Sequence, residues 1–454
     1  MKMILTAFLS SLTVYTSVFS QQLPVLKVSN NKHYIVTDAN KPFFWLGGTA
    51  WELFHRLTKE EAKTYLEDRA GKGFTVIQAV ILAELDGLKT PNVYGDVPLL
   101  NNDPTRLNEK YFKHVDAVIK QAGQLGLYMG LLPTWGDKFN KAWGEGPEIF
   151  TPQNAEIYGE LLAKRYKTQR NIIWILGGDR WPDNEEDREI IRAMARGIRK
   201  VDTEHLVSYH PSGAKKATDF FNEAWLDVDM LQTGHDRQAK EYAFVQASRA
   251  VEPARPVING EPRYEDHPDR FRPEIYGWMD ASDVRTSAYW TMLSGAAGYT
   301  YGCHDIWQMF SNKVTPVNGA RTSWKEALQL PGSTQVKYMK ALLTAFPWQD
   351  MAQDQSVILN ANPQDSSYIV GAIGKNHNFI LAYTPMGKPI KADLSKLNTD
   401  AVQAFWFNPR DGHSKKIGEY KATEKPEFKP WSVGRGSDFV LVLLAANTGY
   451  KLPV

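Results

Sequence analysis

Short apolar runs alternate with amphipathic stretches through the first three-quarters of the chain. In the amphipathic stretches apolar residues recur every three or four positions, which predicts helices starting near Thr58, Tyr111, Asn154 and Asp187. The apolar runs predict strands buried on both faces, as in a parallel sheet: Phe43–Gly47, Thr75–Ile81, Leu127–Leu132, Ile172–Gly177, His205–His210, Val228–Thr233, Pro256–Gly260 and Gly298–Gly302. Eight strands, each followed by a helix, over roughly 300 residues predict an α/β fold, the (β/α)8 TIM barrel.

The pattern changes beyond Phe346, where short strands are separated by turn signals such as the Asn-Pro-Arg-Asp-Gly run at 408–412. This spacing predicts a smaller antiparallel β-sandwich domain. Its strands are expected at Ser356–Leu359, Tyr368–Ile373, Phe379–Thr384, Ile390–Asp393, Val402–Asn408 and Phe439–Leu444. We therefore divide the mature chain into a catalytic barrel, residues 21–345, and a sandwich, residues 346–454. The sandwich is either a structural cap on the barrel or an independent carbohydrate-binding module.

The N-terminus has the pattern of a signal peptide. Lys2 supplies a positive charge, Met3–Val14 is mostly apolar, and small residues precede an expected cleavage after Ser20. Residues 1–20 therefore predict a secreted protein, periplasmic or extracellular, and the apolar run is too short to span a membrane. Cys303 is the single cysteine, so we expect no disulfide framework and interpret Cys303 as packing behind the active face.

Composition narrows the class of partner. The 454 residues carry a net charge of only +2, and no basic stripe is interleaved with aromatics, so nucleic acid is not the expected partner. Aromatic residues make up 12% of the chain, more than the core alone requires. The remaining rings suit stacking on the apolar faces of sugars. We expect a carbohydrate ligand, no membrane span and a monomer.

Two predicted strands end in carboxylates that the apolar pattern does not require. Asp179 follows the fourth strand after two glycines, and Glu261 follows the seventh. Active sites of such barrels lie at the C-terminal strand ends, and a glycosidase needs two carboxyl groups across one sugar. This predicts a glycoside hydrolase with Asp179 and Glu261 as its two carboxyl groups, one to protonate the leaving oxygen and the other to attack the sugar or activate water. Helix capping or pairing with a neighbouring arginine is the alternative, and Glu265 and Asp266 are weaker rivals for Glu261.

Other strand ends supply candidate substrate contacts. They combine aromatic, imidazole and charged groups near the two carboxylates: Trp51, Glu52, Trp135, Lys138, Arg180, His210, His235, Arg263, His304 and Trp307. Three histidines on one face also allow a metal-dependent hydrolase. The first strand has no His-x-His, however, and no other metal-ligand spacing occurs, so we expect neither metal nor cofactor. The basic members, Lys138, Arg180 and Arg263, are candidates to bind the carboxylate of an acidic sugar.

Three motifs resemble those of a known family. They are residues 47–54 (GGTAWELF), 177–180 (GGDR) and 259–265 (NGEPRYE). Together they resemble glycoside hydrolase family 140, secreted bacterial barrel enzymes whose C-terminal sandwich has been labelled collagen-binding. The resemblance implies apiosidase activity, the removal of β-linked apiofuranose from galacturonic acid in the side chains of the pectin rhamnogalacturonan II. The family's catalytic Asp and Glu carry over to Asp179 and Glu261.

The resemblance leaves mechanism and specificity open. Carboxylates on the fourth and seventh strands resemble the large clan of retaining barrel glycosidases, which implies Asp179 as acid/base and Glu261 as nucleophile. That clan usually has Asn-Glu where this chain has Asp179. We expect retention of configuration. A glycosidase acting on another plant polysaccharide and a non-catalytic carbohydrate- or collagen-binding surface protein are the alternatives. A protease is disfavoured because neither a zinc His-Glu-x-x-His motif nor a Gly-x-Ser-x-Gly elbow is present.

Overall fold

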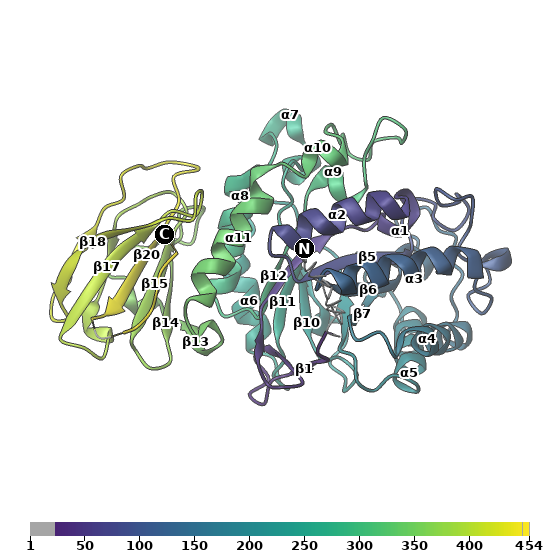
Figure 1. The fold of residues 1–454 in the computed structure, drawn as a ribbon, viewed down its shortest axis with the longest axis horizontal. Coiled ribbons are helices and arrows are strands. Elements are labelled where there is room, and N and C mark those ends of the chain that lie inside the picture. The colour runs from purple at the N-terminus through teal and green to yellow at the C-terminus, as the bar shows by residue number, and fades with distance from the viewer. Residues whose placement is uncertain (1–22, 447, 454) are drawn as a thin grey trace, which may run out of the picture.

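The computed structural model describes residues 23–446 and 448–453, so the predicted signal peptide, residues 1–20, lies outside the described residues. Eight parallel strands form the barrel that the apolar pattern predicts (Figure 1): β4 (Trp45–Thr49), β5 (Val76–Leu82), β6 (Tyr128–Thr134), β7 (Ile172–Gly177), β8 (Val207–His210), β10 (Asp229–Gln232), β11 (Val257–Glu261) and β12 (Gly298–Tyr301). A parallel bridge between Ser208 and Val228 closes the ring. The predicted TIM barrel is confirmed.

Helices surround the barrel, and side chains cap the N-termini of α2, α3, α4, α5, α8 and α10. Thr58 and Glu61 form the capping box of α2, as the Thr-Lys-Glu-Glu run predicts. The helices are α1 (Leu53–Arg56), α2 (Lys59–Gly71), α3 (Glu109–Gln124), α4 (Pro152–Tyr166), α5 (Glu185–Arg199), α6 (Glu241–Arg249), α7 (Pro273–Tyr276), α8 (Ala281–Leu293), α9 (His304–Trp307), α10 (Trp324–Ala327) and α11 (Pro331–Thr344).

One βα unit departs from the prediction of a helix after every strand. Between β8 and β10 the chain forms only β9 (Lys215–Lys216), which pairs antiparallel with β10, and the 3-10 helix η3 (Ala217–Asp219). Phe221 replaces the missing helix as cover for the sheet, with its ring 4.8 Å from that of Tyr209. Pro211 and Gly213, which disfavour a continuous helix, explain the difference.

Two buried clusters stabilise the barrel because alternate residues of each strand face opposite ways. Side chains such as Val76, Ile173 and Met230 fill the interior, and Trp51 and Trp135 cover its C-terminal end. The other faces of the strands pack against the helices. A small antiparallel sheet precedes the barrel, with strands β1 (Leu26–Val28), β2 (Ile35–Thr37) and β3 (Pro42–Phe43).

The C-terminal domain is antiparallel, as predicted. Its main sheet has the order β13-β14-β15-β20-β17-β18, and a two-stranded sheet of β16 and β19 accompanies it. The strands are β13 (Met351–Gln353), β14 (Val370–Gly374), β15 (Phe379–Thr384), β16 (Ile390–Lys391), β17 (Ala401–Phe407), β18 (Ser414–Lys421), β19 (Glu427–Phe428) and β20 (Phe439–Ala445). The strand predicted at Ser356–Leu359 is wrong, since the 3-10 helix η6 (Gln355–Val357) begins there after an Asp354 cap.

The barrel and the C-terminal domain share one core. Helices α8 and α11 lie between them (Figure 1), and residues of β14, β15 and β20 belong to the same buried cluster as the outer layer of the barrel. Tyr289 of α8 stacks on Tyr383 of β15 with ring centres 4.7 Å apart, and Arg285 binds Asp438 through a buried ion pair. The C-terminal domain is therefore packed tightly onto the barrel.

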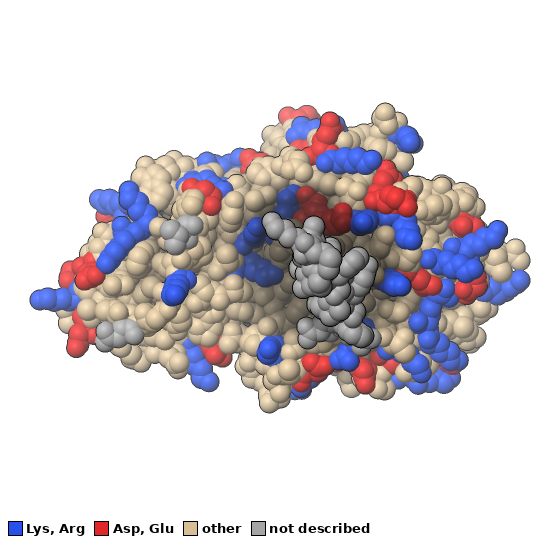
Figure 2. Space-filling model, in the orientation of Figure 1, with Lys and Arg blue, Asp and Glu red and all other residues tan. Residues whose placement is uncertain are grey.

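Charged side chains are mixed in sign over the surface. On the face drawn in Figure 2, Lys and Arg alternate with Asp and Glu across both domains. Among the residues that the structure describes, no helix is long and apolar enough to cross a membrane.

Candidate active site

A pocket of about 680 Å³ opens at the C-terminal end of the barrel. Residues at or after the ends of all eight barrel strands line it. The lining includes six residues singled out from the sequence: Trp51, Trp135, Asp179, His235, Glu261 and Trp307. Its size lies within the range of about 300–1,000 Å³ typical of small-molecule sites. The structure therefore brings both predicted carboxyl groups into one cavity.

Asp179 is presented by a strained turn directly after β7. Gly177, Gly178 and Asp179 have successive φ angles of +85°, +122° and +48°. A Cβ atom on Gly178 would lie 2.9 Å from the Gly136 nitrogen, so both backbone angle and space require glycine there. Gly178 packs against Trp135 and Gly136 of the neighbouring loop, and Gly177 packs against Tyr209 and His210. A non-glycine residue at positive φ is costly and is frequent at functional sites.

The carboxyl group of Asp179 is partly exposed to the pocket and is held on two sides. Gln232 Nε2 donates to Asp179 Oδ1 at 2.9 Å, and Arg180 Nη1 lies 3.4 Å from Oδ2. Burial raises the pKa of Asp179 to about 6, with a further contribution from the negative charge of Glu261. At pH below this value the group is protonated and able to act as a general acid.

Glu261 ends β11 and is held between two imidazoles. His235 Nε2 lies 3.1 Å from Glu261 Oε1, and His210 Nε2 lies 3.0 Å from Oε2. The second contact is close enough for an ion pair, although its angle is poor for a hydrogen bond. Burial by itself would raise the pKa of Glu261, but the two imidazoles outweigh it and lower the pKa to about 2. Between the pKa of Glu261, about 2, and that of Asp179, about 6, Glu261 is therefore ionised while Asp179 is protonated.

Aromatic rings form the floor and rim of the pocket. Trp51 and Trp135 lie 5.1 Å apart, and both pack against the ring of His210. Trp143 and Phe271 also line the pocket and are more than half exposed, so each presents a free ring face near the entrance. Such surfaces suit stacking on sugar rings.

Four predicted substrate contacts instead support neighbouring loops. Lys138 is fully buried in an ion pair with Asp137, and Arg263 is 2% exposed in an ion pair with Glu241. Glu52 is buried against His55, and His304 Nε2 contacts the carbonyl groups of Val317 and Asn318. Because their polar atoms are bound within the protein, the structure does not place any of the four in position to contact substrate directly. The sequence identified these four residues only by their positions at strand ends, and such a position does not show in which direction a side chain points.

Arg180 and His210 lie behind the pocket wall. The Arg180 guanidinium is 4.1 Å from the ring centre of Trp143, and Nη1 donates to the Asp179 carbonyl at 2.7 Å. Its Nε and Nη2 atoms have no hydrogen-bond partner among the described residues. His210 contacts both Asp179 and Glu261. Both side chains therefore lie next to Asp179 and Glu261 without lining the cavity.

The lining residues missed from the sequence include four with polar side chains that face the two carboxyl groups or the sugar space: Glu84, Gln232, Tyr264 and His267. Glu84 comes two residues after β5, so the strand-end rule that found Asp179 would have found it as well. Burial raises the pKa of Glu84 to about 8, and the negative charge of Asp179 adds to the effect. Besides Asp179, Glu261 and Glu145, the pocket thus holds a carboxyl group that is protonated at neutral pH.

The rival carboxylates face a different cavity. Glu265 accepts hydrogen bonds from the Tyr301 hydroxyl at 2.6 Å and the Gly332 amide at 2.9 Å, and Asp266 pairs with Arg321. Both line a pocket between the barrel and the C-terminal domain. Within residues 23–446 and 448–453, His, Cys, Asp and Glu side chains form no group of three or more suited to hold a metal ion. Cys303 is buried.

Comparisons with solved structures identify close overall similarity. One glycoside hydrolase, described as family 5 from Bacteroides vulgatus, is 31% identical, with a TM-score of 0.87 and 95% of each chain covered. Another, described as a glycoside hydrolase, is 32% identical with a TM-score of 0.87, covering 94% of this chain and 98% of the other. No curated protein sequence matches this chain.

Family profiles divide the chain in the same way as the fold. The family "Putative collagen-binding domain of a collagenase" matches residues 353–444. The family "Apiosidase-like, catalytic domain" matches residues 29–350, which is most of the chain and includes every strand of the barrel. The chain therefore belongs to the apiosidase-like family of glycoside hydrolases.

Proposed function

We propose that this protein is a secreted, retaining apiosidase that removes terminal β-linked apiofuranose from galacturonic acid in rhamnogalacturonan II side chains. Asp179 is its acid/base and Glu261 its nucleophile. The observation that carries the proposal is the pair itself, two carboxyl groups in one pocket with pKa values of about 6 and about 2. A glycosidase needs this division, one group protonated and the other ionised at the same pH.

The proposed first step forms a bond between Glu261 and the anomeric carbon as the glycosidic bond breaks. Asp179 gives its proton to the departing oxygen, so the galacturonate hydroxyl leaves neutral. Water then attacks the anomeric carbon, and Asp179 takes up one of its protons while Glu261 is released. The contacts of His210 and His235 stabilise the anionic form of Glu261 before and after this cycle.

A pocket of about 680 Å³ lined from all eight strand ends suits a terminal sugar, because an internal chain segment needs a groove open at both ends. Arg180 is the remaining basic candidate for the acceptor's uronate, since two of its nitrogens lack a partner among the described residues. Its side chain is buried beneath the exposed ring of Trp143, so binding requires Trp143 to move aside. A guanidinium binds carboxylates through paired hydrogen bonds.

The deciding experiment is incubation with rhamnogalacturonan II oligosaccharides and identification of the released monosaccharide. Release of apiose by the wild type, but not by the Glu261→Gln variant, supports the proposal. Release of a different sugar supports the second candidate, a glycosidase of another plant-polysaccharide specificity. If no sugar is released from a panel of plant polysaccharides while binding persists, the protein is a non-catalytic binding protein. The separated pKa values of the two carboxyl groups disfavour that outcome.

A further inference from the structure

The loop after β10 carries His235 into the active site. His235 Nε2 lies 3.1 Å from Glu261 Oε1, and its ring stacks on that of His267 with centres 4.1 Å apart. The backbone of the loop is fixed as well, because the Gly234 amide donates to the Glu261 carbonyl and the Arg270 amide donates to the His235 carbonyl. The position of His235 therefore depends on what holds this short loop.

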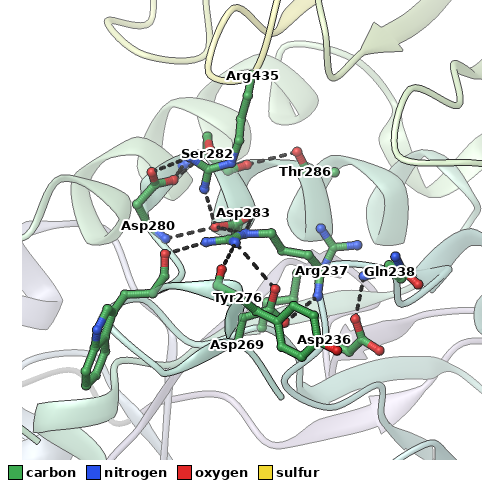
Figure 3. A network of polar contacts seen from close by, with 12 residues as sticks. Asp236, Arg237, Gln238, Asp269, Tyr276, Asp280, Ser282, Asp283, Thr286 and Arg435 are labelled. Atoms are coloured by element: carbon green, nitrogen blue, oxygen red, sulfur yellow. Dashed lines mark hydrogen bonds and ion pairs between the residues drawn. The ribbon is translucent and has the colours of Figure 1, made fainter. Parts of the chain in front are cut away.

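Arg237, two residues further along the loop, is surrounded by acceptors. Its Nε lies 3.1 Å from both carboxylate oxygens of Asp283, and its Nη1 lies 2.7 Å from the Tyr276 carbonyl. Nη1 also contacts Asp269, which accepts the Arg237 backbone amide at 3.2 Å, and Nη2 donates to the Trp278 carbonyl. Figure 3 shows the guanidinium pointing from the loop toward the start of α8. One side chain thus joins the loop to three other segments.

The same carboxylate of Asp283 binds an arginine from the C-terminal domain. Arg435, in the segment between β19 and β20, places Nη2 2.5 Å from Asp283 Oδ2 and Nη1 2.8 Å from Asp280 Oδ2. In Figure 3, Arg435 reaches down from that domain, with Asp283 between it and Arg237. Asp283 is only 4% exposed, so its charge is poorly solvated and needs both arginines.

We propose that Arg237 is a positioning residue of the active site and that the C-terminal domain, through Arg435 and Asp283, holds the loop that places His235 against Glu261. The inference rests on the proposed role of Glu261 as nucleophile. The C-terminal domain is then a structural cap on the barrel and a part of the catalytic unit. It is not the independent carbohydrate-binding module that the sequence left as the alternative. An exposed ion pair contributes little to stability by itself. Arg237 and Arg435, however, share the buried carboxylate of Asp283, and Arg237 lies in the loop that places His235 against Glu261.

The test compares full-length Arg237→Ala, Arg237→Lys and Arg435→Ala with Lys416→Ala. Lys416 pairs with Glu419 on the exposed strand β18, outside the network, so its variant is the matched control. We expect kcat to fall about tenfold or more in Arg237→Ala, with a smaller change in KM, because a displaced His235 no longer stabilises the anion of Glu261. Arg237→Lys keeps the charge but not the paired geometry, so part of the activity returns. Arg435→Ala shows a smaller loss, and the control shows none.

The pH profile separates positioning from a merely structural role. Glu261 faces His210, His235, Asp179 and Tyr264. Loss of the His235 contact raises the pKa of Glu261, so the acid limb of kcat/KM moves to higher pH in Arg237→Ala and Arg435→Ala. A lower melting temperature with unchanged kcat and acid limb overturns the inference. If Arg237→Ala does not fold, Arg435→Ala and Arg237→Lys give the same readout. Full activity of Glu261→Gln overturns the proposed function itself, whatever these variants show.

Discussion

Asp179 and Glu261 are joined by the two nitrogens of a single imidazole. The backbone amide of Asp179 donates to His210 Nδ1 at 3.3 Å, while His210 Nε2 lies 3.0 Å from Glu261 Oε2. Because Nδ1 accepts this bond, the ring proton is assigned to Nε2, which lies beside the carboxylate of Glu261 at an angle poor for a hydrogen bond. The strained turn of Asp179 and the charge of Glu261 are thus fixed by the same side chain, which makes the two carboxyl groups one structural unit.

Replacing either carboxyl group by its amide should abolish most activity. Asp179→Asn removes the proton donor and Glu261→Gln removes the nucleophile, with little change in shape. General acid catalysis is worth about 10² to 10⁴ in rate, and loss of the nucleophile should cost at least as much. Turnover on the natural substrate measures both. Glu265→Gln is the control, since Glu265 faces another cavity, and a variant of the pair keeping more than about a tenth of the rate would contradict the assignment.

The first product released should retain the anomeric configuration of the substrate. Retention follows if Glu261 attacks the sugar directly, which requires the two carboxyl groups to be about 5–5.5 Å apart. Following the anomeric proton of fresh product by NMR distinguishes the outcomes within the first turnovers. An inverted anomer at early time would make Glu261 a base that activates water instead.

Activity should be highest at acidic pH. Catalysis needs Glu261 ionised, which holds above its pKa of about 2, and Asp179 protonated, which holds below its pKa of about 6. We therefore expect kcat/KM to fall tenfold for each pH unit above about 6. A pH series with a constant-ionic-strength buffer measures both limbs. An increase of kcat/KM across the range above pH 6 would exclude Asp179 as the acid.

Glu84 should act as a hydrogen-bond donor rather than as a charge. With its pKa raised to about 8 by burial and by Asp179, it is protonated in the working range of the catalytic pair. Glu84→Gln keeps a donor at the same place and should remain close to wild type, whereas Glu84→Ala should lose about 3- to 10-fold in kcat/KM. Comparing the two below pH 7 is the measurement. Equal losses in both variants would mean that the carboxyl group is needed in its charged form.

Arg180→Ala should discriminate between charged and neutral acceptors. A charge-assisted hydrogen bond is worth about 1.5–3 kcal/mol, so kcat/KM should fall about 10- to 100-fold on a uronate substrate and little on its methyl ester. Because the charge of Arg180 lowers the pKa of Asp179, the alkaline limb should move to higher pH with both substrates.

Arg263→Ala gives the contrast for Arg180→Ala. It leaves Glu241 buried without its partner and should lower stability with no preference between the two substrates. Equal losses of Arg180→Ala on the charged and esterified substrates would remove Arg180 as the acceptor site.

The local pattern of the sequence determined the elements and the position of the pair. The eight barrel strands are continuous apolar runs, because a parallel strand is buried on both faces, and this signal needs no knowledge of distant contacts. Asp179 and Glu261 stand out because each interrupts such a run at the end that a barrel uses for chemistry. Strand β18 was missed for the converse reason, since its edge position leaves Ser414–Lys421 largely exposed and rich in lysine.

Tertiary structure alone decided what each strand-end residue contacts. Three basic residues occupy similar strand-end positions in the sequence: Lys138, Arg180 and Arg263. In the fold, Asp137 pairs with Lys138 and Glu241 pairs with Arg263, whereas two buried nitrogens of Arg180 have no partner among the described residues. Burial and the charge of Glu261 raise the pKa of Asp179, whereas His210 and His235, which come from two other strands, outweigh burial and lower the pKa of Glu261. Electrostatic interactions depend on distance and burial in three dimensions, and neither quantity follows from separation along the chain.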